Sequence, residues 1–129
     1  MDIDLPEVVA EVTAAFARYE RALMANDVAA LDQIFRDDPR TLRYGVGENL
    51  YGHAAIAGFR AARSPVGIAR TISRTVITTY GRDAGVASTL FHRMPGKVGR
   101  QMQTWVRFPD GWHVVAAHVS VIDEPAGAG

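Results

Sequence analysis

The feature that most constrains the fold is a pair of long strand-like segments in the last third of the chain. Gly99–Phe108 and Gly111–Ser120 are rich in β-branched and aromatic residues, and a Pro109-Asp110-Gly111 turn joins them. Two such runs across a short turn predict a β-hairpin. Both strands carry polar residues among apolar neighbours, namely Gln101, Gln103, His118 and Ser120. Buried polar groups need hydrogen-bond partners, and a pocket that holds a polar ligand is one way to supply them.

The remaining elements place helices before strands. Apolar residues recur at helical spacing from Val8 to Leu23, which predicts a long amphipathic helix to about Ala25, with Asp4 and Glu7 as a capping pair. A short second helix follows Asn26-Asp27, and a third spans His53 to Arg63. Strands are expected at Arg40–Tyr44, Leu50–Tyr51, Ala69–Tyr80, Gly85–Arg93, Val98–Phe108 and Trp112–Ile122.

This order predicts a single α+β domain over residues 1–123, in which three N-terminal helices pack in a curved antiparallel sheet. A length of 129 residues with 48% hydrophobic residues suits one domain of ordinary size. Residues 124–129 are expected to form a flexible tail. Because a long sheet curls around its helices, the hollow of the curl is the natural place for a ligand cavity.

Charge and cysteine content narrow the possible partners. The 14 basic and 14 acidic side chains give a formal net charge of zero, so no general field attracts nucleic acid or an anionic membrane. The chain has no cysteine, no secretion signal and no apolar run of membrane-spanning length, so a cytoplasmic location is expected. All basic residues but Lys97 are arginine, which reflects either a GC-rich genome or a need for planar groups that bind carboxylates.

The acidic residues and histidines exclude some chemistry. None of the four long predicted strands has an interior Asp or Glu, whereas a ketosteroid isomerase mechanism needs a carboxylate base on the sheet. The 4 histidines are scattered and form no close pair, so no metal site is expected. The polar groups available to the hollow are Arg, Tyr, His, Gln, Ser and Thr, which favour a small anionic metabolite as substrate.

The chain also resembles known families. The element order, with the spacing of Trp112, His118 and Ser120 in the last strand, is similar to the nuclear transport factor 2-like superfamily. That cone-shaped fold is shared by ketosteroid isomerase, SnoaL-like cyclases and the association domain of calcium/calmodulin-dependent protein kinase, so it implies a fold rather than one function. A narrower set of motifs resembles the AtzH-like family, which includes the oxalurate-catabolism proteins of the HpxZ type. These motifs are Arg43-Tyr44-Gly45 with Glu48, Gly52, Phe59-Arg60 with Arg63, Gly99-Arg100-Gln101, Gln103-Thr104-Trp105-Val106 and Ala117-His118-Val119-Ser120. Met102 departs from the pattern, because many relatives are expected to have Ser there.

The AtzH-like resemblance implies an activity and two catalytic residues. Members are small bacterial proteins linked to amidohydrolases of ureide and cyanuric acid breakdown. The AtzH type is a cofactor-independent decarboxylating hydrolase that converts 1,3-dicarboxyurea to allophanate and carbon dioxide. A tyrosine on the first helix and an arginine on the first strand are regarded as essential in that family, which here correspond to Tyr19 and Arg43.

Each candidate residue also has a structural interpretation. Arg43 either clamps a carboxylate or pairs with Glu48 or Glu20. Tyr19 lies on the apolar stripe of the first helix, where a tyrosine is usually part of the core. Arg60 and Arg63 lie one turn apart and bind a second carboxylate or form a solvated helix face. Gln103, Trp105, His118 and Ser120 complete the expected substrate-binding set, although one sequence does not show which strand faces line the hollow.

The sequence is also compatible with two other functions. The chain could be a non-catalytic pocket domain that binds a carboxylated metabolite or docks on an amidase partner. A ketosteroid isomerase-like or SnoaL-like isomerase or cyclase is a weaker alternative. The resemblance further implies a homodimer that associates through the outer face of the sheet.

Overall fold

The structure is a computed structural model that describes residues 1–125. Its elements are α1 (Pro6–Met24), α2 (Val28–Ile34), β1 (Leu42–Tyr44), β2 (Asn49–Tyr51), α3 (His53–Ala62), β3 (Thr71–Tyr80), β4 (Ala84–His92), β5 (Lys97–Phe108) and β6 (Gly111–Asp123). The third helix and the four long strands lie within two residues of their predicted ends, and the Pro109-Asp110 turn joins β5 to β6 as expected. Of the predicted tail, residues 126–129 lie outside the described residues.

One curved sheet carries the fold, with strand order β2-β1-β6-β5-β4-β3. Strands β3 to β6 form an antiparallel meander, but β1 runs parallel to β6, with Leu42–Tyr44 opposite Ala116–His118. The prediction of a purely antiparallel sheet is therefore wrong, and the sheet is mixed. No tight turn links β1 to β6, so local turn chemistry does not fix the relative direction of these two strands.

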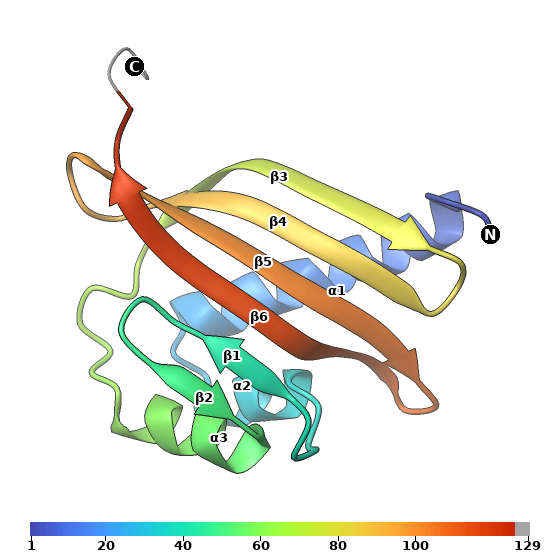
Figure 1. The fold of residues 1–129 in the computed structure, drawn as a ribbon, viewed down its shortest axis with the longest axis horizontal. Coiled ribbons are helices and arrows are strands. Elements are labelled where there is room, and N and C mark those ends of the chain that lie inside the picture. The colour runs from blue at the N-terminus through green and yellow to red at the C-terminus, as the bar shows by residue number, and fades with distance from the viewer. Residues whose placement is uncertain (126–129) are drawn as a thin grey trace.

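All three helices lie on one face of the sheet. Figure 1 looks onto the outer face, with α1 crossing behind the meander and with α2 and α3 behind the β1–β2 end. The core forms where the helices meet the inner face, from Val12, Phe16, Leu31, Ile34, Phe35, Ile56, Ala87, Trp105, Val114 and Ala117. Among the described residues, no helix is both long and apolar enough to cross a lipid bilayer.

The two predicted helix caps have different outcomes. Asp27 caps α2 as predicted, because its Oδ1 accepts a hydrogen bond from the Ala30 N–H at 3.1 Å. Asp4 does not cap α1, whose N-cap is Leu5. Instead, the Asp4 carboxylate accepts from the Thr79 N–H at 2.8 Å, and the Asp4 N–H donates to the Thr79 carbonyl. The free edge of β3 thus holds Asp4, and this contact ties the N-terminus to the sheet.

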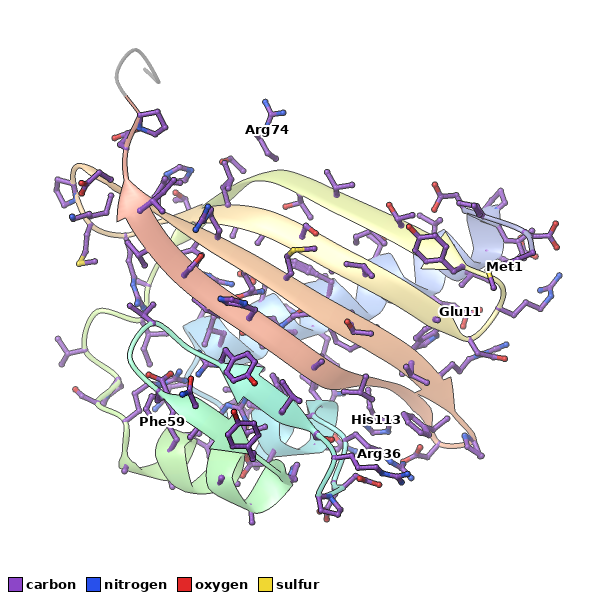
Figure 2. All side chains as sticks on the ribbon, viewed as in Figure 1. Met1, Glu11, Arg36, Phe59, Arg74 and His113 are labelled. Carbon is purple, nitrogen blue, oxygen red and sulfur yellow. The ribbon has the colours of Figure 1, made fainter. Side chains whose placement is uncertain are left out.

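Two bulges shape the sheet. Val115 is an extra residue in β6, because Thr104 pairs with Ala116 while Trp105 pairs with Val114. A second irregularity in β3, between Ser73 and Val76, contains Arg74 with a φ of 50°. Figure 2 shows Arg74 projecting away from the sheet. The β6 bulge decides which residues face the helices, because it shifts the alternation of side chains by one position.

Candidate functional site

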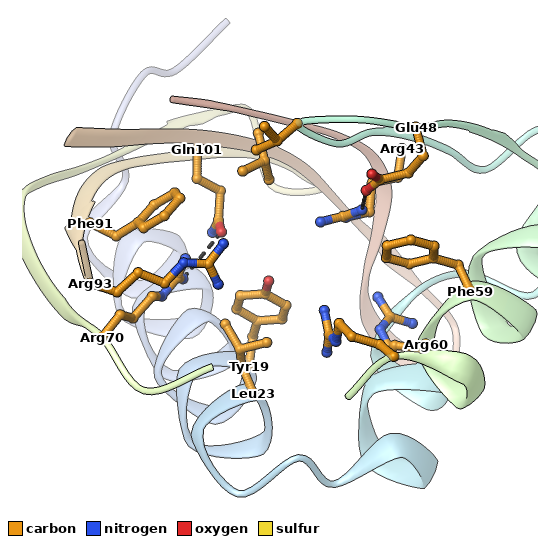
Figure 3. A pocket seen from close by; sticks show the side chains of 13 residues that line it. Tyr19, Leu23, Arg43, Glu48, Phe59, Arg60, Arg70, Phe91, Arg93 and Gln101 are labelled. Carbon is orange, nitrogen blue, oxygen red and sulfur yellow. Dashed lines mark hydrogen bonds and ion pairs between the residues drawn. The ribbon is translucent and has the colours of Figure 1, made fainter. Parts of the chain in front are cut away.

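A cavity of about 170 Å³ opens between the inner face of the sheet and the helices. Figure 3 shows two walls on either side of Tyr19. The α3 wall comprises Arg43, Glu48, Phe59, Arg60 and Arg63, and the β4 wall comprises Arg70, Phe91, Arg93 and Gln101. Leu23, Val46 and Val119 complete the lining. The cavity therefore gathers five arginines from four separate parts of the chain.

Tyr19 lies between the two walls. Its ring belongs to the core, at centroid distances of 6.4 Å from both Phe16 and Phe35, and the residue is only 6% exposed. Its hydroxyl points into the cavity in Figure 3 and forms no hydrogen bond with any of residues 1–125. The core position and the cavity position are thus two ends of one side chain, and a hydroxyl that reaches the cavity without a protein partner is available to a polar ligand.

Arg43 enters the cavity because side chains alternate along β1, where Leu42 and Tyr44 face the other side of the sheet. Its Nη1 donates to Glu48 Oε1 at 2.7 Å, while Glu48 Oε2 accepts from the Gly47 N–H at 3.1 Å. Gly45 leaves room for this carboxylate, since a Cβ there would overlap Glu48. Glu48 therefore orients Arg43 through one nitrogen only, and the other guanidinium donors remain available to a ligand.

The two arginines of α3 have different environments. Arg60 is 5% exposed, with Nη1 3.3 Å from Asp32 Oδ1 and its guanidinium carbon 4.4 Å from the centroid of the Phe35 ring. Arg63 has no carboxylate partner among residues 1–125, and its buried Nε and Nη2 have no hydrogen-bond partner. These two atoms form the edge of the guanidinium that binds a carboxylate bidentately. Burial lowers the pKa of both groups, and the charge of Arg43 lowers it further.

The two arginines of the β4 wall come from the ends of one hairpin. Arg70 directly precedes β3 and Arg93 directly follows β4, and the pairing of Thr71 with His92 brings them side by side. Their guanidinium carbons lie 4.6 Å and 5.6 Å from the centroid of the Phe91 ring.

Phe91 fits there because Gly99 lies opposite it on β5, and a Cβ at that position would overlap the ring. Sequence reasoning missed Arg70, Phe91 and Arg93. These residues lie at or near the ends of two strands that the sequence predicts to pair as a hairpin, and this placement is the signal that could have revealed them.

The arrangement leaves the cavity positively charged. Glu48, Asp32 and Glu20 pair with Arg43, Arg60 and Arg70 respectively. Within residues 1–125, neither Arg63 nor Arg93 has a carboxylate partner, so five guanidinium groups face three carboxylates. No three His, Asp or Glu side chains in this part of the chain cluster as metal ligands would. The donor-rich lining is suited to an anion with several oxygen acceptors.

Comparisons with known proteins identify the family and the fold. A scan of protein families matches residues 1–125 to the AtzH-like family. The chain belongs to this family. Among solved structures, this AtzH-like chain is similar to a protein of unknown function from Pectobacterium atrosepticum, which is assigned to the DUF3225 family. The two chains are 57% identical with a TM-score of 0.92, and the match covers 95% of this chain and 96% of that one. It is also similar to a cystatin-like fold protein from Burkholderia xenovorans, at 47% identity and a TM-score of 0.93, covering 97% and 99% of the two chains.

More distant structures identify the wider fold. A nuclear transport factor 2-like superfamily protein from Salmonella enterica is 27% identical with a TM-score of 0.75, covering 95% of this chain and 97% of that one. A search of curated proteins found no match. The AtzH-like chain thus has the α+β nuclear transport factor 2-like fold, as its sequence motifs suggested.

The fold brings together some of the predicted site residues of this AtzH-like protein and separates the others. Tyr19, Arg43, Arg60 and Arg63 all line the cavity. Gln103 and Trp105 share the inner face with Gln101, but each is 1% exposed and lies outside the cavity lining. His118 and Ser120 lie on the outer face, where His118 contacts Tyr44 at a centroid distance of 6.0 Å and Ser120 Oγ accepts from Arg100 Nε at 3.1 Å. Gln101 takes the place in the lining that the sequence had assigned to Gln103.

Proposed function

We propose that this AtzH-like protein binds a small N-carboxylated urea dianion, such as 1,3-dicarboxyurea, and converts it to allophanate with loss of carbon dioxide. The observation that carries the proposal is the Tyr19 hydroxyl, which lies without a protein partner in a cavity with an excess of guanidinium groups. Donors that the fold already holds in place stabilise developing negative charge without the reorganisation that solvent water would need.

The proposed reaction needs only a proton and a fixed substrate. Arg43 holds one carboxylate and polarises the adjacent urea carbonyl, and Arg63 and Arg60 hold the substrate at the same wall. The bond between one urea nitrogen and its carboxyl carbon breaks, carbon dioxide leaves, and the electron pair stays on nitrogen. The Tyr19 hydroxyl relays a solvent proton to that nitrogen, which gives the allophanate monoanion. Neither a metal nor an organic cofactor enters this scheme.

The decisive experiment measures carbon dioxide release from freshly generated dicarboxyurea. We expect Arg43→Ala and Tyr19→Phe to abolish release above the uncatalysed rate, because the first removes the polarising cation and the second removes the proton relay. His118→Ala is the matched control, since it changes a polar side chain on the opposite face of the sheet. Turnover that survives Tyr19→Phe would contradict the proposed role of the hydroxyl.

A non-catalytic carboxylate-binding domain is the second candidate. The observation that favours it concerns Glu48, the carboxylate of the lining within residues 1–125. Its two oxygens already accept hydrogen bonds from Arg43 and from the Gly47 N–H. The lining within residues 1–125 thus offers donors rather than a free general base. Tight binding of a dicarboxylate without turnover of dicarboxyurea would support this candidate, as would association with an amidase partner.

We also propose that two copies associate through the outer face of the sheet, in the cytoplasm. Val76 and Met102 are apolar residues of this face and are 57% and 56% exposed. Burying them against a second copy would remove apolar surface from water. Sedimentation analysis should show a dimer that Met102→Glu weakens, and a monomeric wild-type protein at all concentrations would contradict the proposal.

A further inference from the structure

We propose that the β4 wall is a second anion subsite, in which Gln101 and Arg93 bind the far carboxylate of a dicarboxylate ligand and the Glu20–Arg70 ion pair positions Gln101. This inference rests on the proposed function, since it concerns the same cavity, and it names what sets the preference of that cavity for two charges. It gives binding or positioning roles to four residues outside the site set expected from the sequence, namely Gln101, Arg93, Glu20 and Arg70.

Gln101 is a fixed donor. The residue is 3% exposed, and its Oε1 accepts a hydrogen bond from Arg70 Nη2 at 3.1 Å. This bond determines the amide orientation, because the oxygen is the only acceptor of the group and the nitrogen carries two N–H donors. Gln101 lines the cavity, and its Nε2 forms no hydrogen bond with any of residues 1–125. A buried amide of this kind presents unused donors to whatever enters the cavity.

The Glu20–Arg70 pair supplies the rigidity. The Arg70 side chain is 4% exposed and that of Glu20 is 16% exposed, and both carboxylate oxygens of Glu20 accept from Arg70. Arg70 also packs on the Phe91 ring. Since Glu20 neutralises Arg70, this arginine does not add net charge to the cavity. Its hydrogen bond to Gln101 makes it a positioning residue.

The net charge of the β4 wall comes from Arg93. This arginine is exposed, stacks near the same Phe91 ring at 5.6 Å, and has no carboxylate partner among the described residues. On the opposite side of Tyr19, the α3 wall has its own unpaired cation, Arg63. Each wall therefore carries one uncompensated charge, and Figure 3 shows the Tyr19 hydroxyl between the walls. A ligand with a carboxylate at each end and a polar centre satisfies all three positions, whereas a monoanion satisfies only one wall.

Binding of an inert ligand pair tests the subsite. Glutarate has a carboxylate at each end and the same chain length as dicarboxyurea, and glutaramate replaces one carboxylate by an uncharged amide of equal size. By isothermal titration calorimetry, we expect wild-type protein to bind glutarate at least about tenfold more tightly than glutaramate, as the loss of one charge-assisted contact predicts.

Variants of the β4 wall should reduce this preference. Arg93→Gln and Gln101→Leu are expected to weaken glutarate binding by about tenfold and glutaramate binding by less than about threefold. Arg100→Gln is the matched control, because it removes one positive charge beside Gln101 but on the outer face, where Arg100 contacts Ser120. Equal losses for both ligands, or no loss in either variant, would overturn the proposal. Arg93 is exposed, so its variant tests the subsite even where Gln101→Leu fails to fold.

Glu20→Gln tests the positioning role. The change leaves Arg70 without its carboxylate, so charge alone would raise the ratio of glutarate to glutaramate affinity, whereas loss of the Gln101 orientation should lower it by about threefold or more. A merely structural defect would lower the active fraction and leave this ratio unchanged.

The outcomes also separate this inference from the proposed function, because neither ligand is turned over. If dicarboxyurea releases no carbon dioxide but glutarate binding depends on Arg93 and Gln101, the activity is wrong and the subsite stands. If the wild-type protein turns over dicarboxyurea but its Arg93 and Gln101 variants bind glutarate normally, the activity stands and the subsite is wrong.

Discussion

Gln101 and Gln103 are the same residue type on the same face of the same strand, yet they lie in opposite environments. Gln101 lines the cationic cavity and accepts from Arg70. Gln103 lies two residues along, outside that lining, where its Oε1 accepts from Trp105 Nε1 at 3.2 Å. One amide thus retains donors for a ligand, and the other stabilises an indole in the core.

The difference lies in what covers the strand. The aromatic and aliphatic residues of α1 and α2 pack over the Trp105 end of β5 and close it. At the Gln101 end, arginines from β1, α3 and the β3–β4 hairpin replace them, and mutual repulsion and hydration prevent these groups from closing into a dry core. A polar residue on a buried strand face therefore indicates a site only when the elements that cover it are known.

Truncating Trp105 at the closed end should change stability most. Trp105→Ala should destabilise the protein by about 3–5 kcal/mol, because it opens a cavity beneath α1 and α2. Urea unfolding followed by circular dichroism measures the loss. The glutarate affinity of the folded fraction should stay within about twofold of wild type, and a larger change would show that the two ends are coupled.

The paired amide substitutions test the comparison directly. Gln103→Leu leaves the buried Trp105 N–H without its acceptor and should cost about 1–3 kcal/mol of folding free energy. Gln101→Leu should cost less, since Arg70 keeps Glu20 as its partner. Denaturant midpoints of the two variants, measured side by side, give the result. A greater loss for Gln101→Leu would mean that the cavity end is also a structural core.

Arg63→Met should separate stability from binding. Burial and the nearby Arg43 lower the pKa of the Arg63 guanidinium, so its charged form is less favourable in the folded state than in the unfolded state. Removing the charge and the unpaired Nε and Nη2 donors should raise the free energy of unfolding by about 1 kcal/mol and weaken glutarate binding. Thermal unfolding with and without glutarate tests both effects. A variant that is less stable than wild type would contradict this interpretation of Arg63.

The smallest expected effect concerns the outer face. His118→Ala should change glutarate affinity by less than about twofold, because His118 packs against Tyr44 on the face opposite the cavity. Calorimetry on this variant and on Arg63→Met, in the same buffer, makes the contrast quantitative. A loss comparable to that of Arg63→Met would show that the two faces communicate through the sheet.

Much of the site was within reach of the sequence. The apolar stripe of α1 located Tyr19, the motif around Arg43 located the first strand, and the spacing of Arg60 and Arg63 put both on one side of α3. The ends of the β3–β4 hairpin could have revealed Arg70 and Arg93, because antiparallel pairing makes the residue before one strand a neighbour of the residue after the next. The faces of β5 and β6 were out of reach, since the bulge at Val115 and the covering helices decide them.

Local sequence patterns encode the elements of this AtzH-like protein and their order. They also encode the alternation that gives Gln101, Gln103 and Trp105 one shared face and gives His118 and Ser120 one shared face. These properties depend on local periodicity and turn chemistry, which neighbouring residues encode. Tertiary packing set the parallel pairing of β1 with β6 and placed Gln101 rather than Gln103 in the cavity. It also decided that Glu20, Glu48 and Asp32 compensate three of five arginines. Those outcomes depend on contacts between residues far apart in the chain, and such contacts exist only once the helices have packed on the curved sheet.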